Sequence, residues 1–188
     1  MKKSKRKKLL KHLACFFCQQ GVQSTSINDI LLASGTGKGQ FYYYFESKNE
    51  LCLEVIKEHI EHWEIDCFQA ILEVDENPKQ QIKKMLDWIY DSHKDQLVHY
   101  GCPIGNLIAE LATSDEADRA LLNQWLQRWQ DLLAGLMIRM QNITENEALI
   151  KAQGLIAQIQ GSILLLKVRQ DIDFLKTNFQ QIEKELAL

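Results

Sequence analysis

The sequence has little proline, few glycines and no long apolar run. Its 188 residues include only two prolines, at positions 78 and 103, and nine glycines. No segment sustains the alternation of apolar and polar residues that is typical of a half-buried strand. No uninterrupted apolar run approaches the roughly 18 residues that cross a bilayer, and the lysine-rich start lacks the apolar stretch of a signal peptide. These absences predict an all-α, cytoplasmic protein that does not enter a membrane.

The number of cysteines is odd. Five cysteines without secretion features predict thiols rather than a disulfide framework. Cys15 and Cys18 are spaced C-x-x-C, but no second pair follows at zinc-finger distance, so buried structural thiols are favoured. His59, His62 and Asp66 could lie on one face of a helix, where solvated side chains are the favoured interpretation. No metal and no cofactor are expected.

Charge is divided unequally along the chain. Residues 1–48 carry nine lysines and arginines and only two acids, Asp29 and Glu46, for a net charge of +7. Residues 49–188 carry 13 basic and 23 acidic residues, for a net charge of −10. A basic head on an acidic body predicts that a polyanion binds at one end. The lysine run from Lys2 to Lys8, taken alone, is also compatible with a solvated tail.

Apolar residues recur at helical spacing along almost the whole chain. Gly21 would end the first helix, and Ser26 with Asp29 three residues later would start the second. Gly35 stops that helix, and Ser47 to Glu50 has the sequence of a capping box that opens a long helix. Beyond the first 46 residues, helices are expected at about 47–75, 79–99, 104–113, 115–141, 145–170 and 172–186.

The segment from Ala33 to Phe45, ASGTGKGQFYYYF, resembles a phosphate-binding loop only superficially. A P-loop needs Ser or Thr after its lysine and a strand before it, whereas Lys38 is followed by Gly39 and preceded by a predicted helix. A helix, a glycine-containing turn and a second short helix form a helix-turn-helix unit, whose second helix enters the major groove of DNA. Phe41 and Phe45 would anchor the inner side of that helix. The predicted polyanion is therefore double-stranded DNA.

Residues from about Leu9 to Val55 resemble the DNA-binding domain of the tetracycline-repressor (TetR) family. The matching residues are Ala14, Phe17, Gly21, Thr25, Ser26, Ile27, Asp29, Ile30, Gly35, Lys38, Gly39, Phe41, Tyr42, Phe45, Ser47, Lys48 and Leu51. Tyr44 departs from the family, which often has His there, and so do Thr36 and Gly37. The resemblance implies a homodimer with a three-helix DNA-binding head and a helical body that binds an effector. We therefore expect a DNA-binding domain at 1–48 and an effector-binding and dimerisation domain at 49–188.

The residue types of the head suggest separate roles at DNA. Tyr42, Tyr44 and Lys48 can contact phosphates, and Gly39 lets the backbone approach the groove. Lys38 can donate to guanine and Gln40 can read adenine. Tyr43 could equally pack within the head. The full set expected to contact DNA is Thr25, Ser26, Thr36, Gly37, Lys38, Gly39, Gln40, Tyr42, Tyr43, Tyr44 and Lys48.

The body has two candidate sites. Gly101 to Leu107, followed by Glu110, resembles a motif of the LmrA/YxaF-like branch of the family. The expected ligand-binding residues, which could equally be plain core, are Trp63, Met85, Trp88, Tyr90, Cys102, Trp125, Trp129 and Met137. The expected dimer interface, whose faces could also pack within the chain, is Gly154, Ala157, Gly161, Leu164, Val168, Phe179 and Ile182.

These expectations combine into a ligand-responsive DNA-binding transcriptional regulator. We expect a repressor that binds a palindromic operator as a homodimer and is released by a small-molecule effector. We expect no enzymatic activity and no catalytic residues. Two alternatives stay open: a thiol- or metal-dependent helical enzyme that uses Cys102 or the histidines, and a DNA-binding protein without an effector.

Overall fold

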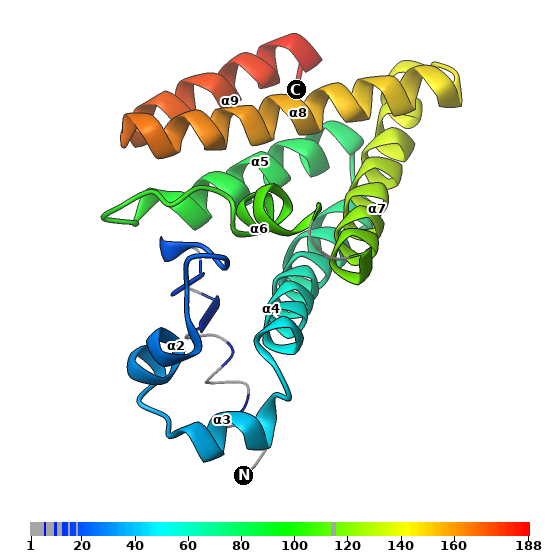
Figure 1. The fold of residues 1–188 in the computed structure, drawn as a ribbon. Helices are drawn as coiled ribbons and strands as arrows, with labels where there is room; N and C mark the ends of the chain where they lie inside the picture. Colours follow the sequence, from blue (N-terminus) through cyan, green and yellow to red (C-terminus); the bar gives the residue numbers. More distant parts are fainter. Residues whose placement is uncertain (1–5, 7–9, 11–12, 15, 18, 114–115) are drawn as a thin grey trace. The chain divides into compact units, whose positions relative to one another are not determined.

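The computed structural model describes residues 6, 10, 13–14, 16–17, 19–113 and 116–188, and this part of the chain is helical, with no strand (Figure 1). The all-α expectation is therefore confirmed. Cys15, Cys18 and all lysines before position 12 lie outside the described residues. The elements are α2 (Ile27–Ser34), α3 (Lys38–Tyr44), α4 (Lys48–Trp63), the π-helix η1 (Glu64–Leu72), α5 (Pro78–Lys94), α6 (Pro103–Leu111), α7 (Glu116–Gln141), α8 (Glu145–Arg169) and α9 (Ile172–Leu186).

The chain divides into two compact units. Unit 1 comprises Met1–Glu61 and Pro103–Leu122, and unit 2 comprises His62–Cys102 and Asn123–Leu188. Both α4 and α7 contribute residues to each unit, so neither unit is a single stretch of sequence. Unit 1 thus includes most of α4, the helix α6 and the start of α7 in addition to the expected head. The functional division at residue 48 stays a prediction.

Unit 1 has an apolar core, to which several of its helices contribute buried side chains. Leu13, Ile30, Phe41, Leu51 and Ile56 are all fully buried. On α4, Leu51 and Val55 are four residues apart and both are fully buried, so one stripe of that helix is removed from water. Burying each such side chain contributes about 1.5–3 kcal/mol before the cost of ordering the chain is counted.

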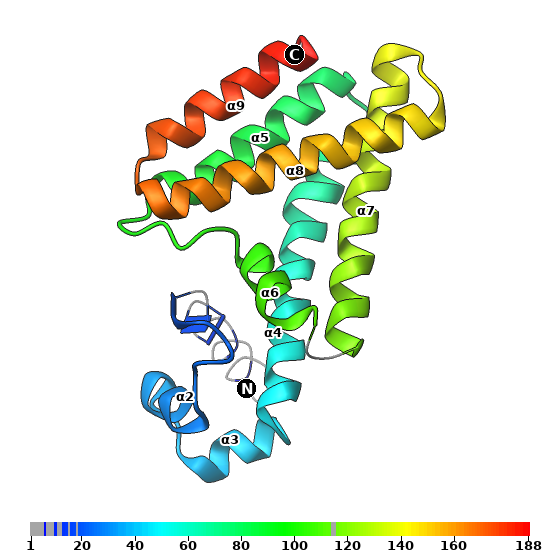
Figure 2. The same ribbon diagram turned by 45° about the horizontal axis from the view of Figure 1, so that its top comes forward.

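Unit 2 is built around α5, α8 and α9, which lie side by side in both views (Figures 1 and 2). Ile159, Ile163 and Leu166 of α8 are buried, as are Phe179 and Ile182 of α9. The apolar stripe of α9 therefore packs within the chain. This places two residues of the expected dimer interface in the core of unit 2.

The expected helix 47–75 consists of two elements, because its second part is a π-helix. The backbone N–H of Glu73 donates to the carbonyl of Phe68, five residues earlier, at 2.9 Å. Arg128 of α7 contacts carboxylates at both ends of η1, at 3.2 Å from Glu64 and 2.7 Å from Glu73. The Gln81 side chain donates to the carbonyl of Leu72 at 2.8 Å, which satisfies a helix-terminal acceptor. These partners are distant in sequence, so a local pattern does not reveal them.

The helix α5 ends at Lys94, five residues before the expected end at 99. Side chains donate hydrogen bonds to carbonyls near its end. Ser92 Oγ donates to the carbonyl of Ile89 at 2.7 Å, and Gln96 Nε2 donates to the carbonyl of Ser92 at 2.7 Å. Leu97 follows with its side chain fully exposed. Leu97 and Val98 lie within the expected helix, but both side chains are exposed.

Among the described residues, α8 is the one helix that is long and apolar enough to cross a membrane, judged by length and composition alone. Eight of its residues are buried against the rest of the protein. Core helices of soluble proteins have the same composition, so this feature is weak evidence for a membrane span.

Candidate nucleic-acid interface

The first helix of the candidate interface, α2, begins with a complete capping box. Ser26 Oγ accepts from the N–H of Asp29 at 3.2 Å, and the Asp29 carboxylate accepts from the N–H of Ser26 at 2.8 Å. The hydrogen bonds from Ser26 lower the pKa of the Asp29 carboxyl. The expected helix start at Ser26 is confirmed. The Ser26 side chain is exposed but is engaged in this cap.

Thr25, one residue earlier, points into the protein. Its side chain is 1% exposed, and its hydroxyl donates to the carbonyl of Gly21 at 2.5 Å. The hydroxyl is therefore used inside unit 1, although Thr25 is among the residues expected to contact DNA.

The turn between α2 and α3 depends on Gly35. Its φ is +63°, in the left-handed region, and its N–H bonds to the carbonyls of Leu31 and Leu32. The N–H of Thr36 also donates to Leu31, at 3.2 Å. Two residues later Gly37 caps the start of α3 in extended conformation. A helix, a glycine turn and a short helix thus follow as the sequence predicted.

The helix α3 is anchored on one side by phenylalanines and exposed elsewhere. Phe41 is fully buried and Phe45, which ends the helix, is 1% exposed. Tyr42 packs edge-on against Phe41 with ring centroids 5.2 Å apart, yet 45% of it remains exposed. Tyr43 is 63% exposed, whereas Tyr44 is half-buried, and these two rings also pack edge-on. Aromatic packing therefore holds the three tyrosine rings at the border between the core and the surface.

The residues at the start of α3 are exposed to solvent. Lys38 and Gln40 are exposed, and a Cβ added to Gly37 or Gly39 would meet nothing within 4 Å. Neither glycine has a positive φ, so the backbone conformation does not require glycine at either position. A glycine in a helix costs about 1 kcal/mol relative to alanine. Packing among the described residues does not account for that cost at Gly39.

The start of α4 departs from the expected capping box. Ser47 Oγ accepts from the N–H of Glu50 at 3.1 Å, but the Glu50 carboxylate accepts from the N–H of Glu46 rather than of Ser47, at 2.5 Å. Lys48, the first residue of α4, is half-buried. Among the described cations, Arg6 pairs with Glu54 at 2.6 Å, and its guanidinium lies 5.2 Å from the centre of the Phe45 ring. The pattern of lysines did not predict this anchor.

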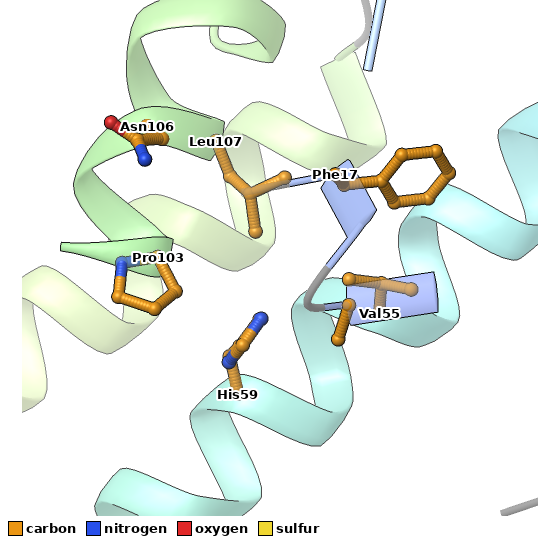
Figure 3. Close-up of a pocket in the computed structure, with 7 residues that line it drawn as sticks. Phe17, Val55, His59, Pro103, Asn106 and Leu107 are labelled. Carbon is orange, nitrogen blue, oxygen red and sulfur yellow. The ribbon is translucent and has the colours of Figure 1, made fainter. Parts of the chain in front are cut away.

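Unit 1 also has a narrow, mostly apolar hollow between α4 and α6 (Figure 3). The ring of His59 points toward Pro103 and Leu107 there, with Val55 and Phe17 at one side. Apolar side chains make up most of its wall, so it lacks the converging polar groups that are typical of a ligand site. We interpret it as a packing gap.

Unit 2 contains a tryptophan cluster, which we define as Trp63, Trp88, Trp125 and Trp129. Trp63 lies at its centre, with ring centroids 4.9 Å from Trp88, 5.3 Å from Trp125 and 4.8 Å from Trp129. The indole N–H of Trp129 points to the sulfur of Met85 at 3.3 Å. The indole N–H of Trp125 is buried and has no acceptor in the described part of the chain.

The structure therefore brings five of the eight expected ligand-binding residues together. Of the other three, Met137 is fully buried on α7, Tyr90 is half-buried on α5, and Cys102 accepts from Gln160 of α8 at 3.6 Å. Burial accounts for most of these side chains. The unpaired N–H of Trp125 is the feature that burial does not explain, because an unsatisfied buried donor costs about 1–3 kcal/mol.

One face of α8 exposes apolar and small residues. Leu164 is 62% exposed and Val168 is 80% exposed, and Gly154 and Ala157 on the same helix are also exposed. Gly161 is half-buried, and a Cβ added there would meet nothing within 4 Å. We call Gly154, Ala157, Gly161, Leu164 and Val168 the α8 face. Exposed apolar residues that gather in this way mark interaction surfaces.

The described cysteines are buried thiols. Burial raises the pKa of Cys52 to about 12 and also raises that of Cys67, so both are protonated at neutral pH. His62 and Asp66 form an exposed pair at 2.6 Å. In the described part of the chain no three His, Cys, Asp or Glu side chains gather as metal ligands would.

Two family models match this chain. The family model "Bacterial regulatory proteins, tetR family" matches residues 14–55, and the model "Transcriptional regulator LmrA/YxaF-like, C-terminal domain" matches residues 78–181. An uncharacterized HTH-type transcriptional regulator in the lacX 3' region of Lactococcus lactis subsp. lactis is 46% identical over 165 residues, which are 88% of this chain and 84% of that protein. The HTH-type transcriptional regulator LmrA of Bacillus subtilis is 29% identical, with 85% of each chain covered. The crystal structure of regulatory protein TetR from Rhodobacter sphaeroides is similar in fold, with a TM-score of 0.83 over 95% of this chain and 96% of that one, at 22% identity.

Proposed function

The chain belongs to the TetR family of bacterial transcriptional regulators, in the branch with an LmrA/YxaF-like C-terminal domain, and on this basis we propose that it is a ligand-responsive repressor. It binds a palindromic operator as a homodimer and leaves the operator when a small molecule binds in unit 2. The observation that carries this proposal is the helix α3, whose phenylalanines are buried while Lys38, Gln40, Tyr42 and Tyr43 are exposed.

In this proposal α3 is the recognition helix. Lys38 donates to the acceptors of guanine in the major groove, and Gln40 pairs with adenine. The absence of a side chain at Gly39 allows the helix backbone to approach the base edges. The hydroxyls of Tyr42 and Tyr44, together with the Lys48 ammonium, contact phosphates on either side of the groove.

The homodimer forms through the α8 face. Gly154 and Gly161 allow two helices to approach closely, and the exposed side chains of Leu164 and Val168 supply apolar area to bury. Because Phe179 and Ile182 are already buried in unit 2, α9 supports the interface from within the chain. Two copies related by a two-fold axis would place two recognition helices on half-sites about 34–36 Å apart.

The effector binds at the tryptophan cluster. The unpaired indole N–H of Trp125 supports a ligand that carries a hydrogen-bond acceptor, and the surrounding rings favour an apolar or aromatic body. Binding there favours a dimer geometry in which the recognition helices no longer match the operator. The site of action is the bacterial chromosome, so the protein is cytoplasmic.

The test begins with selection of bound sequences from a pool of random duplexes. Enrichment of an inverted repeat, bound by a dimer, is the expected result. Binding without sequence preference would instead support an architectural DNA-binding protein, and no duplex binding would contradict the proposal. Small molecules that quench the tryptophan fluorescence are then tested for release of the selected duplex, and Trp125→Phe is the matched variant because it keeps an aromatic ring without the N–H.

A further inference from the structure

The side chain of Glu110, on α6, holds the turn that precedes α2. The backbone N–H of Gln23 donates to Glu110 Oε2 at 3.0 Å, and Gln23 Nε2 donates to the backbone carbonyl of Glu110 at 2.9 Å. The two residues are 87 positions apart in the sequence, and both belong to unit 1. A hydrogen bond to a charged acceptor is about twice as strong as a neutral one.

Gly21, at the start of this turn, leaves room for the carboxylate. Its φ is +81°, a conformation that favours glycine, and a Cβ built on it would lie 2.9 Å from Glu110 Oε1 and 3.1 Å from Oε2. The carboxylate therefore occupies the space that a side chain at position 21 would fill. The turn and the carboxylate fit each other.

The turn from Gly21 to Thr25 determines where α2 begins. The hydroxyl of buried Thr25 donates to Gly21 at 2.5 Å, and the N–H of Thr25 donates to Val22 at 3.2 Å. Ser26, the N-cap of α2, follows directly. A displacement of Gln23 would thus move the start of α2, and through the short Gly35–Gly37 turn it would move α3.

The motif from Gly101 to Leu107 precedes Glu110 in the sequence and links it to a residue that contacts α8. The helix α6 starts at Pro103, immediately after Cys102, whose sulfur accepts a hydrogen bond from Gln160 of α8 at 3.6 Å. The chain therefore leads in a few residues from a contact with α8, through one helix, to the carboxylate that holds the turn before α2.

We propose that Glu110 is a positioning residue for DNA binding, which keeps the turn at Gly21–Thr25, and hence α2 and α3, in the orientation that fits the operator. The proposal rests on the proposed DNA-binding function. Glu110 contacts neither bases nor phosphates in this role. It acts only through Gln23 and the turn.

The test compares Glu110→Ala and Glu110→Gln in the full chain, with two measurements. Hydrogen exchange of the Gln23 amide needs no DNA and should become at least about tenfold faster in the alanine variant, because its acceptor is gone. Binding of the duplex selected by the unmodified protein should weaken by about tenfold. Glutamine keeps an acceptor oxygen at the same distance, so Glu110→Gln should stay within about threefold of the unmodified protein in both measurements.

Glu147→Ala is the matched control. Its carboxylate also accepts from a backbone N–H, that of Thr144 at 2.9 Å, but at the start of α8 in unit 2. It should lose similar thermal stability and still bind the selected duplex normally. If Glu110→Ala does not fold, Glu110→Asp, which withdraws the carboxylate by one methylene, takes its place with the same expected losses.

Three results would overturn the proposal: normal exchange at Gln23 in Glu110→Ala, duplex binding no weaker than that of Glu147→Ala, or a loss in Glu110→Gln as large as in the alanine variant. Failure of the unmodified protein to bind any duplex would instead contradict the proposed function. The exchange measurement would then still decide whether Glu110 holds the turn.

Discussion

The rings of Phe41 and Phe45 pack against each other with centroids 5.7 Å apart, and both side chains are almost completely buried. Residues four apart lie on one face of a helix, so this pair attaches α3 to the core of unit 1 by a single side. The exposed residues of α3 carry no packing role of comparable size. They can be substituted to test DNA binding with little effect on the fold.

Lys38→Ala is predicted to relax sequence preference at one or two base pairs. Loss of a base contact costs about 1–3 kcal/mol at the preferred pair and little elsewhere. Tyr42→Phe is the comparison, since removal of a phosphate contact should weaken all duplexes alike. Binding to a panel of duplexes with single base-pair changes separates the two effects. An unchanged affinity and preference in Lys38→Ala would show that α3 is not placed in the groove as proposed.

The lysines of the N-terminal tail are predicted to contribute to the salt dependence of DNA binding. The variant replaces Lys2, Lys3, Lys5, Lys7 and Lys8 with glutamine and keeps Arg6, because Arg6 pairs with Glu54. The slope of log affinity against log salt should decrease by about 0.9 for each phosphate that the variant no longer neutralises. A slope equal to that of the unmodified protein would identify the tail as solvated and uninvolved.

Gly161→Trp is predicted to convert the dimer to a monomer. An indole on the α8 face would overpack the place where the partner helix passes. The variant should sediment as a monomer, keep most of its helical circular dichroism, and bind a half-site weakly instead of the palindrome. Gly135→Trp is the control, because Gly135 is also a helical glycine at which an added Cβ would meet nothing within 4 Å, on α7. A dimeric Gly161→Trp with normal palindrome binding would exclude the α8 face from the interface.

Acid is predicted to destabilise unit 2 through His93. Burial lowers the pKa of this histidine, and nearby His99 lowers it further, so the folded state holds the neutral ring. Since the unfolded chain binds a proton below a pH of about 6.5, stability is complete above that pH and decreases as the pH falls below it. The decrease is at most about 1.4 kcal/mol per pH unit for this one group. Thermal unfolding between pH 5 and 8 measures it, and His93→Gln should show a flatter profile; an identical profile would assign the effect to other groups.

Local sequence signals predicted most of the helical framework. The capping box at Ser26 and Asp29 is present, Gly35 ends α2 in the left-handed conformation, and α7, α8 and α9 begin and end within one residue of their expected bounds. These features depend on residues within one turn of each other, so the sequence alone contains the information. The expected contacts with DNA, effector and partner stay predictions.

Several differences between the expectations and the structure depend on side chains that are distant in the sequence. The π-helix η1 is held at both ends by Arg128 from α7, and the hydroxyl of Thr25 is directed inward within a turn that Glu110 of α6 holds. The stripe of α9 and the face of α8 have similar spacing in the sequence, yet Phe179 is buried and Val168 is exposed. Periodicity identifies an apolar face but does not say which neighbour covers it.

The sequence by itself determined an all-α chain, a basic helix-turn-helix head and the positions of its turns, because charge, glycines and caps act over a few residues. Only the tertiary structure decided which side chains remain accessible. It placed Tyr42 and Tyr43 at the surface, left the N–H of Trp125 without an acceptor among the described residues, and joined Gln23 to Glu110 across 87 residues. Such pairings depend on how helices that are distant in the chain pack together, and packing is a property of the folded state.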